Sequence, residues 1–246
     1  MEITVPRRYC GPPSSGNGGW TSGALASHVR ALHDCPAVSV RLSSPPPLDR
    51  PMTVVGEDHE PLTGRPALRL YDGEVLVASA TPVAELDEPV PAPATAEEAE
   101  RAQARYEGDE DHPFPSCFVC GTDRDPGDGL HRRPGPLMDG SGRYATTWTV
   151  TDDVSRAVSW GALDCPSGWA AGVAGRAMVL GTMTARVWRV PSPGETLVVT
   201  AWKRGEQGRR TRSASTLHAE NGELVGRAET VWVAVDPSTV RPVGAR

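Results

Sequence analysis

The sequence predicts an α+β fold of two similar units, each an antiparallel sheet wrapped around one central helix. Short matches recur in the same order in both halves of the 246 residues: Gly19-Trp20 matches Gly168-Trp169, and residues 72–75 (DGEV) match residues 221–224 (NGEL), both 149 positions apart. Each half starts with one helical segment and continues as segments rich in Val and Thr that end at Gly, Pro or Asn turns. A repeat of this length and order predicts a tandem duplication.

The two units are separated by a stretch rich in proline and acid. Residues 87–112 contain several prolines and close on an acidic run, so we predict a linker between units at 1–86 and 113–246. Within the linker, Thr95 and Glu98 have the spacing of a capping box. They predict a short, mostly solvated helix that stops at Gly108.

The strands of each unit are expected in a meander. The predicted strands are residues 38–43, 52–56, 67–71 and 74–83 in the first unit and 184–190, 196–204, 209–219 and 224–235 in the second. The last of them is apolar on both faces near its end, which is typical of a central or interface strand.

The composition excludes several classes of function. With 25 Lys and Arg against 31 Asp and Glu, the formal net charge is −6, which argues against a nucleic-acid partner. Lys203 is the only lysine, so lysine-based covalent catalysis is disfavoured. No apolar run approaches a membrane span, and the five cysteines without a signal-peptide pattern predict a soluble protein of the reducing cytoplasm, with no membrane partner.

Several motifs resemble the hotdog-fold thioesterase superfamily. They are residues 117–121 (CFVCG) with the following Gly129-Leu130, residues 163–170 (LDCPSGWA), residues 193–199 (PGETLVV), residues 226–234 (GRAETVWVA) and, in the first unit, residues 16–20 (GNGGW). The last motif is similar to the helix start of acyl-CoA thioesterase II-like double hotdogs. One departure is clear, because residues 159–161 (SWG) stand where the family usually has His-Gly-Gly.

This resemblance implies a tandem (double) hotdog fold and a thioester hydrolase. The expected substrate is an acyl-CoA or an acyl carrier protein thioester, cleaved at the junction of the two units. No cofactor is expected apart from coenzyme A as part of the substrate. A homodimer of double hotdogs, formed through exposed sheet edges, is a further expectation.

Thioester hydrolysis needs hydrogen-bond donors aimed at the carbonyl oxygen. Gly18 and Gly19 begin the first helix, where main-chain N–H groups are free and side chains do not obstruct the substrate. Asn17 adds an amide that either binds the same oxygen or caps the helix. An ordinary turn leading into a helix is the alternative interpretation of the glycine pair.

The reaction also needs a carboxylate that acts as general base or nucleophile. The first unit has no acid between Glu2 and Asp34, whereas the second helix carries Asp164. We therefore predict one composite site with donors from the first helix and Asp164 from the second. The competing hypothesis is that Asp164, two residues before Pro166, only caps its helix.

Substrate contacts are expected from aromatic and basic residues. Trp20 and Trp169 occupy matching positions in the repeat and are candidate pocket residues, with Ser22 on the same helix as Trp20. Arg204 and Arg209 belong to a basic hairpin that suits the phosphates of coenzyme A or an acidic carrier protein. A solvated hairpin tip is the alternative.

Cysteine and histidine residues offer two other kinds of chemistry. Cys117 and Cys120 form one C-x-x-C pair, and His112 and His131 are the nearest candidate partners for zinc. The expectation is a buried thiol pair that stabilises a turn, with no metal site. Cys165 could act as a nucleophile beside a helix start, but no histidine lies near it in the sequence.

Two other functions compete with hydrolysis. A hotdog dehydratase would need a histidine paired with an acid, for which His28 and Asp164 are the candidates. A non-catalytic acyl-binding protein is the second alternative, because the His-Gly-Gly segment is replaced.

Overall fold

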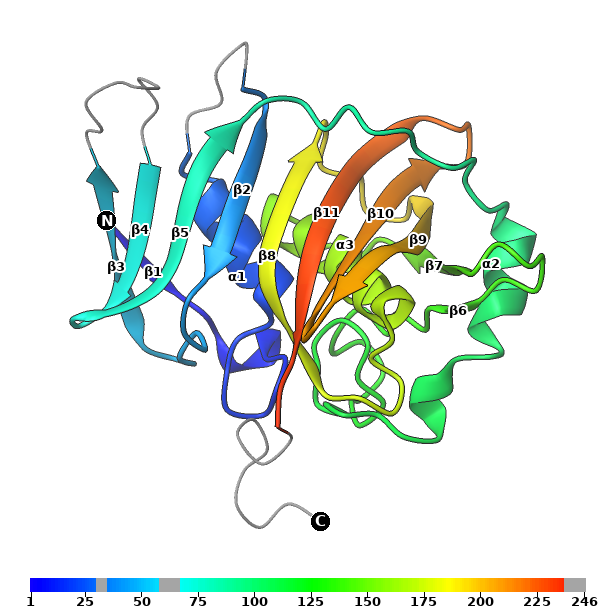
Figure 1. Ribbon diagram of the computed structural model, residues 1–246, viewed down its shortest axis with the longest axis horizontal. Helices are drawn as coiled ribbons and strands as arrows, with labels where there is room; N and C mark the ends of the chain where they lie inside the picture. Colours follow the sequence, from blue (N-terminus) through cyan, green and yellow to red (C-terminus); the bar gives the residue numbers. More distant parts are fainter. Residues whose placement is uncertain (30–34, 58–66, 237–246) are drawn as a thin grey trace.

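The computed structural model describes residues 1–29, 35–57 and 67–236. In this part of the chain, eleven strands form one continuous antiparallel sheet. The helices α1 (Gly18–Ala26) and α3 (Arg156–Ala171) pack against each other on one face of that sheet (Figure 1). The core lies between these helices and the strands.

The strand order is the same on both sides of the centre of the sheet. Outward from the centre, the first half runs β2 (Ala37–Leu42), β5 (Val75–Val83), β4 (Ala67–Asp72), β3 (Pro51–Glu57) and β1 (Glu2–Thr4). The second half runs β8 (Met178–Val187), β11 (Leu224–Ala234), β10 (Arg210–Ala219), β9 (Thr196–Gln207), β7 (Arg143–Thr149) and β6 (Gly135–Pro136).

The two halves meet at an antiparallel junction between β2 and β8. Val38 pairs with Ala185 and Arg41 with Thr182, so the sheet continues through the centre without a gap. This junction places the first-half helix α1 beside the second-half helix α3.

The two helices approach each other closely through glycines. A Cβ atom added at Gly19 would lie 2.3 Å from Cβ of Asp164, and one at Gly23 would lie 2.7 Å from Cβ of Trp160. Because Gly19 meets the later residue of α3 and Gly23 the earlier one, the helices run antiparallel. Glycine spacing of four residues thus forms one smooth face of α1.

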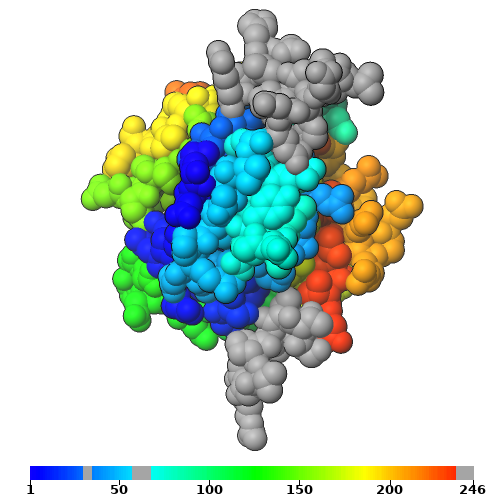
Figure 2. Space-filling view, turned by 90° about the vertical axis from the view of Figure 1, so that its left-hand side faces the viewer, coloured from blue at the N-terminus to red at the C-terminus, as the bar shows by residue number. Residues whose placement is uncertain are grey.

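The meander prediction is right for the last three predicted strands of each half and wrong for the first. The runs β3–β4–β5 and β9–β10–β11 are meanders, but β2 pairs with β5 and β8 with β11, so the first predicted strand of each half does not lie beside the second. Strand β8 also begins at Met178 and not at residue 184 as predicted. The matched DGEV and NGEL segments form the β4–β5 and β10–β11 turns, in which Gly73 and Gly222 have φ values of 58° and 85°. The apolar strand β11 is central, between β8 and β10, as predicted. Strands β1, β6 and β7 were not predicted; Figure 2 shows β1 beside β3 at the outer end of the sheet, with β4 on the other side of β3.

The predicted linker helix is present but is not mostly solvated. Helix α2 (Ala96–Gln103) has the capping box of Thr95 and Glu98, which confirms that prediction. Ala99 and Ala102 are fully buried against β7 and β9. The helix ends before Gly108, which lies in a separate 3₁₀ turn, Glu107–Asp109.

The second helix begins earlier than the sequence suggested. Ser155 caps α3, its hydroxyl accepting a hydrogen bond from the Val158 N–H, and the helix continues through Pro166. Asp164 therefore lies in the interior of the helix, and its predicted role as a helix cap is wrong. Residues 157–171 are all buried, so packing compensates for the hydrogen bond that Pro166 cannot donate.

Among the described residues, no helix is long and apolar enough to cross a membrane.

Candidate active site

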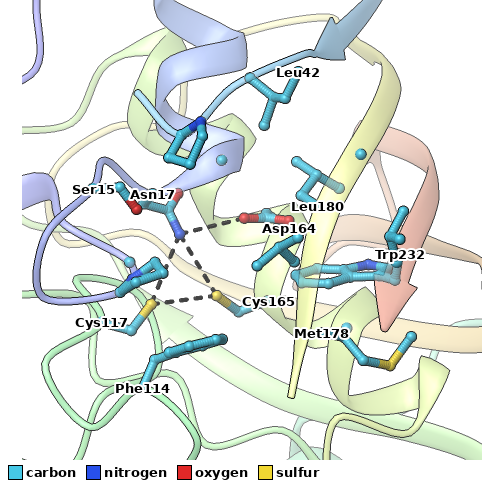
Figure 3. A pocket seen from close by; sticks show the side chains of 18 of the residues that line it. Ser15, Asn17, Leu42, Phe114, Cys117, Asp164, Cys165, Met178, Leu180 and Trp232 are labelled. Carbon is cyan, nitrogen blue, oxygen red and sulfur yellow. Dashed lines mark hydrogen bonds between the residues drawn. The ribbon is translucent and has the colours of Figure 1, made fainter. Parts of the chain in front are cut away.

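A cavity of about 430 Å³ lies where α1, α3 and the adjoining ends of β8 and β11 meet. Its walls are mainly apolar and include Leu42, Met178, Leu180, Trp232 and Phe114 (Figure 3). The volume is in the range of small-molecule binding sites, and a few polar groups converge on it. Those groups come from both halves of the chain.

Asn17 and Gly18 contribute the first half of the site. Asn17 is the N-cap of α1: its Oδ1 accepts a 2.8 Å hydrogen bond from the Trp20 N–H, which leaves Nδ2 to point toward Asp164. Gly18 lines the cavity, and a Cβ atom there would lie 2.9 Å from Cβ of Leu180. Because Gly18 is in the first helical turn, its N–H has no intrahelical acceptor.

Asp164 contributes the second half. Its Oδ2 accepts a 2.9 Å hydrogen bond from the Gly19 N–H and a 3.3 Å hydrogen bond from Asn17 Nδ2. The missing side chain of Gly19 is what allows this approach. The Gly19 N–H is thus occupied by the carboxylate, so it is the Gly18 N–H that remains as a candidate donor to a substrate oxygen.

The environment of Asp164 favours its protonated form. The residue is 1 % exposed, and its Oδ1 has no hydrogen-bond partner. Burial raises the pKa of Asp164 to about 8, against the opposing effects of the Gly19 and Asn17 hydrogen bonds. A carboxyl with this pKa can exchange a proton near neutral pH.

Three cysteines line the same cavity, and the sequence did not predict that Cys165 joins the other two in one cluster. Cys117 Sγ lies 3.6 Å from Cys165 Sγ, and Asn17 Nδ2 donates to both sulfurs at 3.8 Å. Cys120 completes the group, in which all three sulfur atoms lie within 4.8 Å of one another. Cys165 could not be assigned to this cluster from the sequence, because the C-x-x-C spacing does not include it.

The pKa values of the three thiols are shifted in opposite directions. Hydrogen bonds from Cys120 and Cys165 lower the pKa of the Cys117 thiol well below its usual value. The bond to Cys117 raises the pKa of Cys165, and burial raises the pKa of Cys120.

The two histidines considered as zinc ligands are engaged elsewhere. Nδ1 of His112 accepts a hydrogen bond from the Phe114 N–H, and its Nε2 lies 3.0 Å from the carbonyl oxygen of Cys120. Nε2 of His131 lies 3.0 Å from the carbonyl oxygen of Asp125. A zinc site formed by Cys117, Cys120 and these two histidines is therefore wrong.

Of the two tryptophans predicted to contact the substrate, only Trp169 lines the cavity. Trp169 is 1 % exposed and lines the cavity. Trp20 does not line it but stacks on Tyr9, with ring centroids 4.4 Å apart, and Ser22 is buried with no partner for its hydroxyl. The repeat misaligned the two tryptophans: Trp20 is the third residue of α1, whereas Trp169 is third from the end of α3.

The two arginines predicted to contact the substrate lie in different places. Arg204 lines a different, polar hollow, where it forms ion pairs with Glu88 and Glu229. Arg209 is exposed in the β9–β10 turn, and its carbonyl oxygen accepts a hydrogen bond from the Ala234 N–H, next to the cavity-lining end of β11.

His28 does not meet Asp164. It is exposed just beyond the end of α1, nine residues after the glycine that contacts Asp164, which corresponds to about 13 Å along a helix. The histidine and acid pair expected for a dehydratase is therefore wrong.

Comparisons by sequence and by structure give different results. No protein-family model matches the chain, and no curated protein matches its sequence. Solved structures do match: the tesB protein of Mycobacterium avium subs paratuberculosis has 14 % identity and a TM-score of 0.60, covering 96 % of this chain and 92 % of that one. The acyl-CoA thioesterase II TesB2 from Mycobacterium marinum has 12 % identity and a TM-score of 0.56, covering 97 % and 93 %.

A third match is a conserved protein of unknown function with hot dog fold from Alicyclobacillus acidocaldarius. It has 14 % identity and a TM-score of 0.57, covering 96 % of this chain and 93 % of that one. At these identities the likeness establishes the fold. The resemblance predicted from the motifs is therefore confirmed at that level: the chain has the hotdog fold that thioesterase II structures share.

Proposed function

We propose that the protein hydrolyses acyl thioesters at one composite site between two tandem hotdog units. The observation that carries this proposal is the meeting of Asn17 and Gly18 from α1 with Asp164 from α3 in a single apolar cavity. The name of one structural neighbour, the acyl-CoA thioesterase II TesB2 from Mycobacterium marinum, supports the same reaction class.

Asp164 is the proposed general base. When ionised, it accepts a proton from a water molecule as that water attacks the thioester carbonyl carbon. Its Oδ1 has no hydrogen-bond partner and is therefore available for this proton. The contact between Gly19 N–H and Oδ2 fixes the orientation of the carboxylate.

The oxyanion of the tetrahedral intermediate needs donors in a water-poor site. The Gly18 N–H, at the positive end of the α1 dipole, is one proposed donor. The other is the Asn17 amide: one of its two hydrogens is directed at Asp164, and the second makes only long contacts of 3.8 Å to the cysteine sulfurs. The intermediate then collapses by breaking the C–S bond, and the proton held by Asp164 passes to the leaving thiolate, which restores the carboxylate.

The apolar cavity is the proposed site for the acyl chain. Trp169 and Leu180 form part of its wall. Coenzyme A, or the phosphopantetheine of a carrier protein, would extend from the mouth as part of the substrate. Arg209, exposed beside the end of β11, is the proposed contact for an anionic part of that substrate.

The tandem units in this proposal correspond to residues 1–86 and 113–246, with residues 87–112 as their linker. The repeated strand order on both sides of the β2–β8 junction supports this division. Pairing of two copies through the sheet edges stays a prediction, as does the cytoplasmic location.

A panel of acyl-CoA and acyl-pantetheine thioesters of different chain length tests the proposal. The protein is incubated with each thioester, and free thiol is measured with a chromogenic thiol reagent. Release that depends on protein concentration supports hydrolysis. Turnover of 3-hydroxyacyl-CoA without thiol release would instead indicate a dehydratase, and binding without either reaction an acyl-binding protein.

A further inference from the structure

The cluster of Cys117, Cys120 and Cys165 is not used by the proposed hydrolysis. The three residues are buried, at 4–6 % exposure, and none is in a disulfide. Two come from the loop after α2 and the third from α3, so the fold brings together sulfur atoms that are 45 and 48 positions apart in the sequence. The cluster lines the wall of the cavity beside Asp164.

The loop that carries two of the cysteines is tightly built. The Gly121 N–H donates a 2.9 Å hydrogen bond to the Cys117 carbonyl oxygen. A Cβ atom at Gly121 would lie 2.3 Å from the carbonyl oxygen of Pro115 and 2.6 Å from the Cys117 main chain, so only glycine fits this turn. The two sulfur atoms are thereby held on the same side of the turn.

A hydrogen-bond donor lies beside two of the sulfur atoms: Asn17 Nδ2 donates to Cys117 and Cys165 at 3.8 Å. Donors of this kind stabilise thiolates and orient the ligands of a metal ion from outside its coordination shell.

We infer that these three cysteines bind one Zn²⁺ ion in the wall of the cavity. Tetrahedral zinc with Zn–S bonds of about 2.3 Å holds its sulfur ligands about 3.8 Å apart. The Cys117–Cys165 separation of 3.6 Å already fits, and the 4.8 Å limit on the whole cluster requires shifts of about 1 Å at most. Thiolate ligands select zinc over the hard cations that prefer oxygen.

The fourth coordination position would be open. Among residues 1–29, 35–57 and 67–236, no other histidine, cysteine or carboxylate belongs to the cluster. Zinc sites with three protein ligands and an open position take a water molecule or a small ligand there. Because the sulfur atoms line the cavity, that position is accessible to a ligand in the cavity, such as a thiol. The inference replaces the sequence-based expectation of no metal.

Metal content tests the inference without reference to hydrolysis. The chain is purified without added metal under reducing conditions and analysed by elemental mass spectrometry. About one zinc per chain supports the inference, whereas zinc below about a tenth of an equivalent, or copper in its place, overturns it.

Cobalt replacement then locates the site. After removal of the metal by a chelator, titration with Co²⁺ should give a thiolate-to-cobalt charge-transfer band that saturates at one equivalent. Cys165→Ala should lose most of this band, while Cys35→Ala, a buried cysteine outside the cluster, should keep it. An unchanged band in Cys165→Ala, or no band in the wild-type chain, overturns the site. The wild-type titration remains decisive where Cys165→Ala does not fold.

Discussion

Replacing Asp164 by Asn should make the stability of the protein less dependent on pH. The substitution keeps an oxygen that can accept the Gly19 N–H, but it removes the ionisable group. In the folded protein, burial raises the pKa of Asp164 from 3.8 to about 8. The carboxyl group of Asp164 therefore binds its proton more tightly in the folded state than in the unfolded state.

The sign and size of the effect follow from linkage. The favourable contribution of Asp164 is fully present below pH 3.8 and is lost as the pH rises to about 8. At about 1.4 kcal/mol per pKa unit, the total loss is about 6 kcal/mol, of which about 5 kcal/mol falls between pH 4 and pH 9. The free energy of unfolding of Asp164→Asn, relative to wild type, should rise by that amount over this interval.

Urea unfolding followed by tryptophan fluorescence measures this difference. Both proteins are unfolded at several pH values with a chelator and a reductant present, so that both are metal-free with reduced thiols. Asp152→Asn, in an exposed turn, is the matched control and should follow the wild-type curve. If the difference in unfolding free energy between Asp164→Asn and wild type stays constant within about 1 kcal/mol from pH 4 to pH 9, the raised pKa of Asp164 is refuted.

Three further substitutions test the packing, the cap and the substrate contacts. Gly23→Ala should destabilise the protein by about 1–2 kcal/mol in thermal unfolding, because overpacking against Trp160 outweighs the gain in helix propensity. Its matched control, Gly161→Ala, should cost less, because the nearest atom to the new Cβ, Cγ2 of the buried Val119, is 3.3 Å away and has to move by only a few tenths of an ångström. Asn17→Ala should lose about 1 kcal/mol of stability, because it removes the N-cap of α1. It should also lower kcat more than it changes KM, because it removes a proposed oxyanion donor. An unchanged kcat would exclude the amide from the mechanism. Arg204→Ala should leave KM for an acyl-CoA within about twofold, because Arg204 lies outside the cavity, and a KM raised tenfold would place the substrate on that hollow instead.

The strands were predictable because their signals are local. Alternating Val and Thr segments, bounded by turns such as those at Gly73 and Gly222, specify hairpins within about ten residues of sequence. The repeat then indicated two similar halves. Strand β1 and the two-residue β6 lack such a pattern, and pairing with neighbours defines them.

The start of α3 was not predictable from local preferences. Pro166 suggested a helix beginning near Asp164, but tertiary packing extends the helix back to Arg156 and buries nearly all of it. This is why Asp164 became an interior residue whose partners come from the other half of the chain.

The composite site could be predicted only in part. Asn17 and Asp164 were brought together by assuming that the two helices meet, and their hydrogen bond agrees with that assumption. The contribution of Cys165 depends on how α3 packs against the loop that carries Cys117 and Cys120, and the separate place of Arg204 depends on the face of the sheet to which its side chain points; no spacing in the sequence encodes either. The role of Gly19 in admitting the carboxylate likewise depends on the distance between helices.

The release of free thiol from an acyl-CoA by wild type and by Asp164→Asn tests the central claim most directly. The wild-type protein should release thiol catalytically, and the folded variant should be slower by at least about 100-fold, because a general base contributes a factor of that order. Asp152→Asn should match the wild-type rate. A folded Asp164→Asn protein that hydrolyses the same thioester at the wild-type rate would contradict the account.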